Sequence, residues 1–108
     1  MIDLIISEAA ALSIIEQADY YQQAADLALA QRWEASVDQA VHSLLTQPER
    51  GALCRFRSPD LLGLRWILIP GFPKHLVFYR YLHEEQAILI VQVLHGARNL
   101  EIILDEDE

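Results

Sequence analysis

The sequence predicts an α+β domain with the element order β-α-α-β-β-β, in which a helical hairpin packs on one face of an antiparallel sheet. Residues 8–45 carry apolar side chains at helical spacing, on one face of each of two helices. Residues 64–94 carry three apolar runs, rich in β-branched and aromatic residues, that are separated by turn-forming residues. Because a hairpin of this kind cannot bury its own apolar stripe, it must lie on the sheet.

The first elements begin with short local signals. Residues 2–6 are apolar and β-branched, and they predict an opening strand. Ser7 is expected to cap the first helix, because its hydroxyl can accept a hydrogen bond from a free amide N–H in the first turn. Apolar residues then recur on one helical face over residues 11–25 and again over residues 29–45, with Asp26 as a possible second cap.

The last third of the chain predicts three strands joined by two turns. Pro70 and Gly71 fit the centre of the first turn, because proline presets φ and glycine accepts a positive φ. Residues 83–86 are polar and form the second turn, before an almost unbroken apolar run at residues 88–94 that is typical of a central strand. Residues 52–64, before this meander, are expected to hold a short edge strand or an irregular loop.

Length and composition indicate one domain, predicted at residues 1–104, followed by an acidic tail at residues 105–108. The 108 residues are 53% hydrophobic, which is enough for a sizeable core. Cys54 is the single cysteine, so an internal disulfide is excluded. No apolar run approaches the length of a membrane span, and the N-terminus lacks the pattern of a signal peptide, so a cytoplasmic location is expected.

The net charge of −8 is distributed unevenly. Residues 1–49 carry −7 and residues 101–108 carry −5, whereas residues 50–80 carry +5. The acids of the helical half are expected to face solvent. The basic segment favours an acidic partner that docks on the strands, and the overall charge does not favour nucleic acid.

If residues 83–86 form the turn between the last two strands, these strands pair antiparallel, and the residue numbers of each facing pair add to about 169. His95 then lies opposite Lys74, and Arg80 lies opposite Leu89. One sheet face is expected to carry an aromatic set from the second strand of the meander: His75, Val77, Tyr79 and Tyr81. We expect this face to be the open, partner-binding side, although a slip of one residue would exchange the last-strand residues on each face.

The motifs of the last third resemble a known family. A strand leads into Pro-Gly-Phe-Pro at residues 70–73, a second strand ends in Phe-Tyr-Arg at residues 78–80, and a third ends in Leu-His-Gly-Ala-Arg at residues 94–98. This pattern resembles the RelE/ParE superfamily, the toxins of bacterial type II toxin–antitoxin modules, and most closely its ParE, or plasmid-stabilisation, branch. The resemblance implies the same element order, no cofactor, and a hetero-oligomer with a small, ParD-like antitoxin.

Three functions stay open at this stage. The ParE branch implies a toxin that is not itself an enzyme, poisons DNA gyrase and is neutralised by its cognate antitoxin. The RelE branch implies a ribosome-dependent mRNA endoribonuclease, and the third alternative is an inactive relative that binds an antitoxin. Lys74 is the only lysine and the pI is near 4.8, which is unfavourable for binding the phosphate-rich surface of a ribosome.

The ribonuclease alternative requires a base, an acid and cations around the scissile phosphate. The resemblance implies this set of candidates: His75, Tyr79, Arg80, His95 and Arg98. The residues expected to bind a partner are cationic or lie on the predicted open face: Arg55, Arg57, Arg65, Lys74, Val77, Tyr79, Arg80, Tyr81 and Arg98. Arg80 is expected to reach solvent, an acid or a partner, because an unpaired guanidinium is costly to bury.

Metal and thiol chemistry are not predicted. The four histidines are scattered, without paired carboxylates or a second cysteine, and they predict no metal site. Cys54 has no evident activating neighbour beyond Arg55, so an unreactive thiol is expected.

Overall fold

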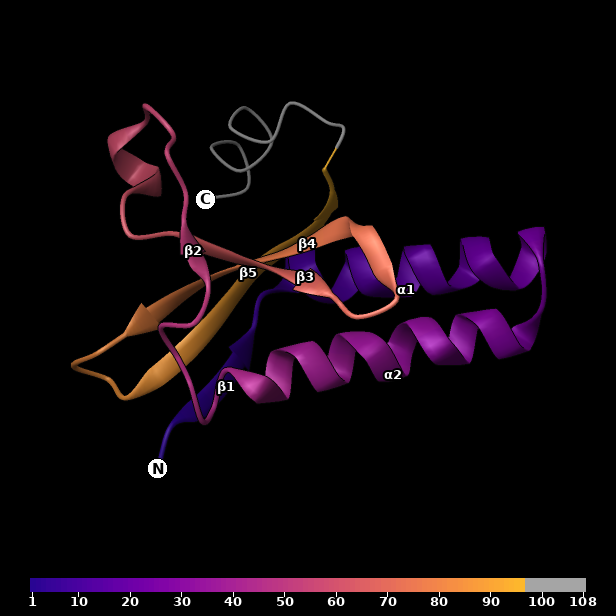
Figure 1. Ribbon diagram of the computed structural model, residues 1–108, viewed down its shortest axis with the longest axis horizontal. Helices are drawn as coiled ribbons and strands as arrows, with labels where there is room; N and C mark the ends of the chain where they lie inside the picture. Colours follow the sequence, from indigo (N-terminus) through magenta and orange to yellow (C-terminus); the bar gives the residue numbers. More distant parts are fainter. Residues whose placement is uncertain (97–108) are drawn as a thin grey trace.

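Figure 1 shows the computed structural model, which describes residues 1–96. The elements are β1 (Asp3–Ile6), α1 (Glu8–Ala24), α2 (Leu27–Ser43), β2 (Ala52–Leu53), the 3₁₀ turn η1 (Pro59–Leu61), β3 (Arg65–Ile69), β4 (Phe72–Leu82) and β5 (Ala87–His95). The predicted α+β class and element order are confirmed, with β2 added as a short edge strand. The predicted domain end at residue 104, the tail at 105–108 and Arg98 lie outside the described residues.

The sheet is mixed, which corrects the expectation of a wholly antiparallel sheet. Its strand order is β1-β5-β4-β3-β2, and β1 pairs with β5 in parallel while the other pairs are antiparallel. Parallel neighbours need a long connection, and the whole chain between β1 and β5 supplies it.

Both predicted helix caps are present. The Ser7 hydroxyl accepts a hydrogen bond from the Ala10 N–H at 3.0 Å and donates to the Val91 carbonyl at 2.7 Å. The Asp26 carboxylate accepts a hydrogen bond from the Leu29 N–H at 2.8 Å and caps the start of α2. Because α1 ends at Ala24, the two helices follow each other almost directly. The result is the helical hairpin seen in Figure 1, with α1 and α2 side by side.

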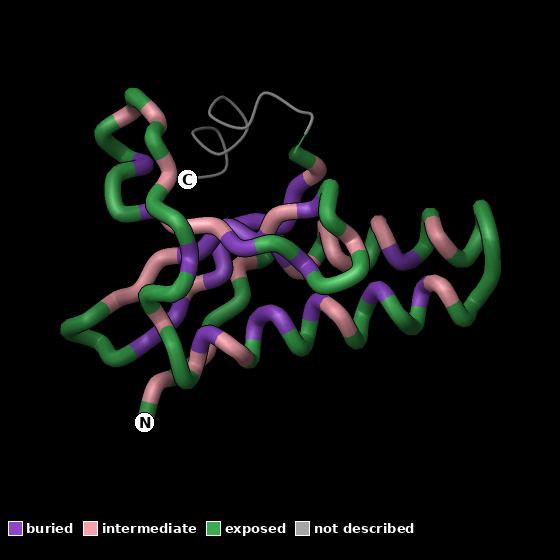
Figure 2. The backbone as a smooth tube through the Cα atoms, viewed as in Figure 1, coloured by how far each residue is buried: buried purple, intermediate pink, exposed green. Residues whose placement is uncertain are grey.

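The main core lies between this hairpin and the sheet. Figure 2 shows the buried stretches of α2 on its side toward the strands. Trp33 is fully buried there, and its indole N–H donates to the Ile14 carbonyl at 3.0 Å. The sheet contributes these buried residues to the same cluster: Ile67, Ile69, Val77, Tyr79, Ile88, Ile90 and Val93.

The prediction that Val77 and Tyr79 lie on an open face is therefore wrong. Both side chains are fully buried, and Tyr81 is partly buried against the same cluster. The period of two along a strand determines which residues share a face, but it does not determine which face the helices cover.

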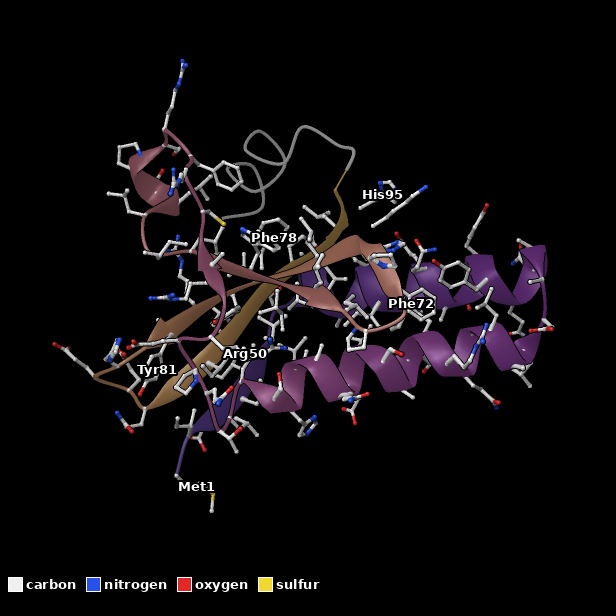
Figure 3. The ribbon with its side chains drawn as sticks, in the orientation of Figure 1. Met1, Arg50, Phe72, Phe78, Tyr81 and His95 are labelled. Atoms are coloured by element: carbon white, nitrogen blue, oxygen red, sulfur yellow. The ribbon has the colours of Figure 1, made fainter. Side chains whose placement is uncertain are left out.

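The opposite face of the sheet is also covered over its centre. Phe78, labelled in Figure 3, is buried there in a second cluster with Val91 and Leu94. Leu61 and Leu64, from the segment between β2 and β3, complete the buried part of this cluster. The centre of the sheet is therefore covered on both faces, which leaves its edges and ends as the places where it can be open.

The pairing of β4 with β5 contains an irregularity. Arg80 lies opposite Leu89 as predicted, but beyond Tyr79 the register shifts by one residue. Val91 is the additional residue, since Tyr79 pairs with Ile90 and Phe78 pairs with Gln92. His95 consequently faces His75, and its predicted pairing with Lys74 is wrong.

The Gln92 side chain stabilises this bulge. Its carboxamide oxygen accepts hydrogen bonds from the Ser13 hydroxyl at 2.7 Å and from the Val93 N–H at 2.9 Å. The bulge is thereby tied to α1 in the folded protein.

Candidate functional site

Two of the predicted partner-binding arginines are occupied by the backbone of the chain itself. The Arg65 guanidinium donates to the carbonyls of Glu49 at 3.2 Å and Gly51 at 2.7 Å. The Arg80 guanidinium donates to the carbonyls of Leu62 and Asp60. These two arginines satisfy carbonyl groups of the irregular segments before and after β2, so their first role is structural.

Other cations of the basic segment are exposed: Arg50, Arg55, Arg57 and Lys74. Arg55 lies beside Leu53, whose exposed fraction of 54% is high for an apolar side chain. An open cavity of about 700 Å³ is lined by Ala52, Leu53, Cys54, Arg55 and Trp66. We name these five residues the β2 edge; they combine apolar surface with a guanidinium.

The position of β2 adds backbone groups to this surface. It is the last strand of the sheet, and among the described residues it pairs only with β3. An edge strand presents N–H and C=O groups to which an extended segment of another chain can pair. The β2 edge therefore offers hydrogen bonds, apolar contacts and charge together.

Tyr79 holds the loop that leads to this edge. Its hydroxyl donates to the Pro48 carbonyl at 2.8 Å and accepts from the Gly51 N–H at 2.9 Å. Burial raises the pKa of the Tyr79 phenol. Gly51 is required at this close approach, because a Cβ there would lie 2.5 Å from the Tyr79 oxygen.

A second candidate site lies where α1 meets the ends of β4 and β5. The rings of His75 and His95 have centroids 5.2 Å apart and are nearly perpendicular, at 84°. Both histidines, with Gln17 and Tyr20 of α1, line two adjoining cavities of about 560 and 220 Å³. Figure 3 shows His95 at this end of the sheet, well away from Arg50 and Tyr81.

His75 is the more buried of the two histidines. Its ring packs against Trp33, with centroids 4.8 Å apart. Burial, and to a smaller extent the neighbouring His95, lower the pKa of His75. This imidazole is therefore favoured in its neutral form near neutral pH.

The candidate ribonuclease residues are not assembled into one site. His75 and His95 come together, but Arg80 is five residues along β4 from His75, which corresponds to roughly 17 Å. Arg80 also lies on the other face of the strand, and the Tyr79 hydroxyl is already bonded to the loop after α2. Arg98 lies outside the described residues.

Cys54 is partly buried, and this burial raises the pKa of its thiol to about 11, against a smaller opposing effect of Arg80. We expect its alkylation by iodoacetamide at pH 8 to be at least about tenfold slower in the folded protein than in urea, because the thiolate is the reacting species. Time-resolved mass spectrometry measures both rates. Equal rates would show that the thiol is neither shielded nor held protonated.

Sequence reasoning missed the cavity at the β2 edge and the pairing of the two histidines. Residues 52–64 were expected to hold a short edge strand or an irregular loop, but a strand of two residues is too short for alternation to show which side chains lie around it. The histidine pair depends on the bulge at Val91, and the almost unbroken apolar run of β5 carries no local signal for a bulge. The density of arginines around Leu53 was the one available indication of the first site.

The chain is similar to known proteins in fold and in sequence. No helix in residues 1–96 is both long and apolar enough to span a membrane. None of the curated proteins matches the chain. A solved structure described as "Chromosomal ParDE TA system from P. aeruginosa" is similar with a TM-score of 0.71 and 18% identity, over 88% of this chain and 96% of that chain.

At that identity, the structural similarity shows a shared fold. The sequence similarity extends further, because the family described as "ParE toxin of type II toxin-antitoxin system, parDE" matches residues 4–100. This match covers nearly all of the α+β domain and includes the motifs of the last three strands. The chain belongs to the ParE toxin family of type II toxin–antitoxin systems.

Proposed function

We propose that this protein is a bacterial toxin that acts in the cytoplasm, poisons DNA gyrase and is held inactive by a cognate antitoxin. The observation that carries the proposal is the match to the ParE toxin family over residues 4–100. The similar structure from P. aeruginosa is described as a ParDE system, which supports an antitoxin as the partner of this chain as well.

The arrangement of side chains favours gyrase over the ribosome as the target. In-line cleavage of RNA needs an acid, a base and phosphate-binding cations at one place. Among residues 1–96, the pair of His75 and His95 is separated from Arg80, and Tyr79 is buried in another contact. The net charge of −8 further disfavours a phosphate-rich target.

The β2 edge is the proposed docking site for the antitoxin. An extended acidic segment can pair its backbone with β2, place an apolar side chain against Leu53 and Trp66, and direct carboxylates toward Arg55 and Arg57. We expect a small, ParD-like antitoxin to bind in this way and to form a hetero-oligomer. Since the arginines are exposed, the affinity should fall as the salt concentration rises.

Growth of bacteria that express the chain tests the proposal in cells. Induction alone is expected to arrest growth and produce elongated cells with undivided DNA, because blocked gyrase damages DNA. Co-expression of the small acidic protein encoded by the neighbouring reading frame is expected to restore growth. Harmless expression of correctly folded protein would contradict the proposal and favour an inactive, antitoxin-binding relative.

A second candidate function is supported by the proximity of His75 and His95, which could exchange protons in RNA cleavage. In vitro translation followed by primer extension tests it. Specific cuts in messages at the ribosomal A site would favour the ribonuclease, whereas intact messages at concentrations that arrest growth would exclude it.

A further inference from the structure

We propose that the acidic residues 101–108 dock on the β2 edge and on Arg57 of the same chain, and compete there with the acidic segment of the antitoxin. The docking rests on the charge, the composition and the reach of these residues. Only the competition rests on the proposed function, since it requires the antitoxin to bind at the β2 edge.

The two parts of the chain have opposite charge. Residues 101–108 carry −5 and no cation, whereas residues 50–80 carry +5. Within residues 1–96, Arg55 makes no hydrogen bond or salt bridge, and its side chain lines the open cavity of the β2 edge. Arg57 is exposed two residues further along the chain. The acids of residues 101–108 are therefore matched in charge to this surface.

The attachment to the same chain makes weak contacts sufficient. A single ion pair between exposed side chains is weak, and salt screens it. A segment that is joined to its binding surface by a short stretch of chain, however, has an effective concentration on the order of millimolar. Several weak contacts at that concentration populate the docked state without any tight interaction.

Apolar residues of the segment match the other part of the β2 edge. Four of them lie just before the acidic run at residues 105–108: Leu100, Ile102, Ile103 and Leu104. At the β2 edge, Leu53 has an exposed fraction of 54% and lies with Trp66 around a cavity of about 700 Å³. Burial of apolar side chains there adds to the charge attraction, and β-branched residues suit pairing with an edge strand.

The β2 edge is also within reach. The described residues end just beyond β5, which is separated from β2 by β4 and β3 (Figure 1). Leu53 is level with Ile90, so the way from Gly96 is roughly 20 Å along β5 and three spacings of roughly 4.8 Å across the sheet, in all about 25 Å. Residues 105–108 follow Gly96 by about 9–12 residues, and an extended chain of that length spans roughly 30–40 Å.

The acidic residues lie beyond the part of the chain that matches the ParE toxin family, because that match ends at residue 100. They are therefore a feature of this chain and not of the domain that the family describes. A contact made by these residues would regulate access to the β2 edge in this protein specifically.

Paramagnetic NMR tests the docking without any partner. A nitroxide label is attached at Glu106→Cys in the background of Cys54→Ser, because Cys54 is the single cysteine. At low salt, we expect the amide signals of Leu53 and Trp66 to lose at least about half of their intensity, and the signal of Arg32 on α2 to be unchanged. High salt should restore the lost intensity, since it screens exposed charges.

Charge reversal of the surface provides the matched variant. Arg55→Glu with Arg57→Glu should restore the signals at low salt, and circular dichroism checks that the fold is retained. Full intensity at Leu53 and Trp66 in the labelled chain, or an equal loss in the charge-reversed variant, would overturn the docking. A loss that appears only when labelled chains are mixed with ¹⁵N-labelled chains would place residues 101–108 on a second copy and would also overturn it.

Calorimetry with the small acidic protein encoded by the neighbouring reading frame tests the competition. The variant neutralises the acidic run: Asp105→Asn, Glu106→Gln, Asp107→Asn and Glu108→Gln. We expect it to bind at least about threefold more tightly than the unsubstituted chain at low salt, and equally at high salt. The control makes the same change in net charge on exposed acids of the helical hairpin: Glu16→Gln, Asp19→Asn, Glu34→Gln and Asp38→Asn. It should change the affinity by less than about twofold.

The two measurements separate the inference from the proposed function. Equal affinities of the variant at residues 105–108 and of the hairpin control would overturn the competition. A chain that does not poison gyrase would contradict the proposed function, whereas the nitroxide measurement would still decide whether residues 101–108 dock on the β2 edge.

Discussion

Replacing Trp33 with alanine is expected to lower the free energy of unfolding by about 3–5 kcal/mol. The side chain is fully buried between the helical hairpin and the sheet, with ring centroids 5.2 Å from Phe72 and 4.8 Å from His75. The substitution leaves a cavity at this contact and removes the hydrogen bond to the Ile14 carbonyl. Since small domains are stable by only about 5–15 kcal/mol, much of the total would be lost.

Urea denaturation followed by circular dichroism measures this change. Tyr20→Ala is the matched control, because Tyr20 is also an aromatic residue of the helical hairpin but has an exposed fraction of 62%. Its substitution is expected to change the free energy of unfolding by less than about 1 kcal/mol. A similarly small loss for Trp33→Ala would show that the helices do not pack on the sheet as described.

Reversing the charges of Arg55 and Arg57 is expected to weaken antitoxin binding at least about 100-fold at low salt, which corresponds to roughly 2.7 kcal/mol. The double variant Arg55→Glu and Arg57→Glu replaces attraction for acidic side chains by repulsion, at Arg55 of the β2 edge and at Arg57 two residues further along the chain. Both residues are exposed, and circular dichroism of the variant checks that the fold is retained. Calorimetry at low and high salt measures the affinity, and the difference between the variant and the unsubstituted chain should shrink as salt screens the charges.

Arg32→Glu provides the control for net charge. Arg32 is exposed on α2, away from the β2 edge, so its reversal should change the affinity by less than about threefold. An equal loss from Arg32→Glu would indicate a general effect of charge. Unchanged affinity in the double variant would place the antitoxin elsewhere on the toxin.

Much of the fold could be predicted because it depends on local chemistry. The caps at Ser7 and Asp26 are hydrogen bonds over three residues, and a side chain with the right oxygen at the right place is sufficient to form them. The turn at Pro70 and Gly71 likewise follows from the backbone preferences of those two residues, and Gly71 has φ of +81°.

The open surface could not be predicted, because it depends on choices between distant segments. Alternation placed Val77 and Tyr79 on one face, but both faces of β4 are apolar, and only the packed structure shows that the helices cover this one. Arg80 is bonded to carbonyls about 20 residues earlier in the chain, a pairing that no sequence spacing reveals. The bulge at Val91 then changed the partner of His95, and with it the composition of the second site.

A cleavage assay with purified DNA gyrase and supercoiled plasmid tests the central claim most directly. We expect the purified protein to produce linear plasmid after denaturation of the complex, in proportion to its concentration, and the cognate antitoxin to suppress this product. Plasmid that stays supercoiled, together with messages cut at the ribosomal A site by the same preparation, would contradict the account.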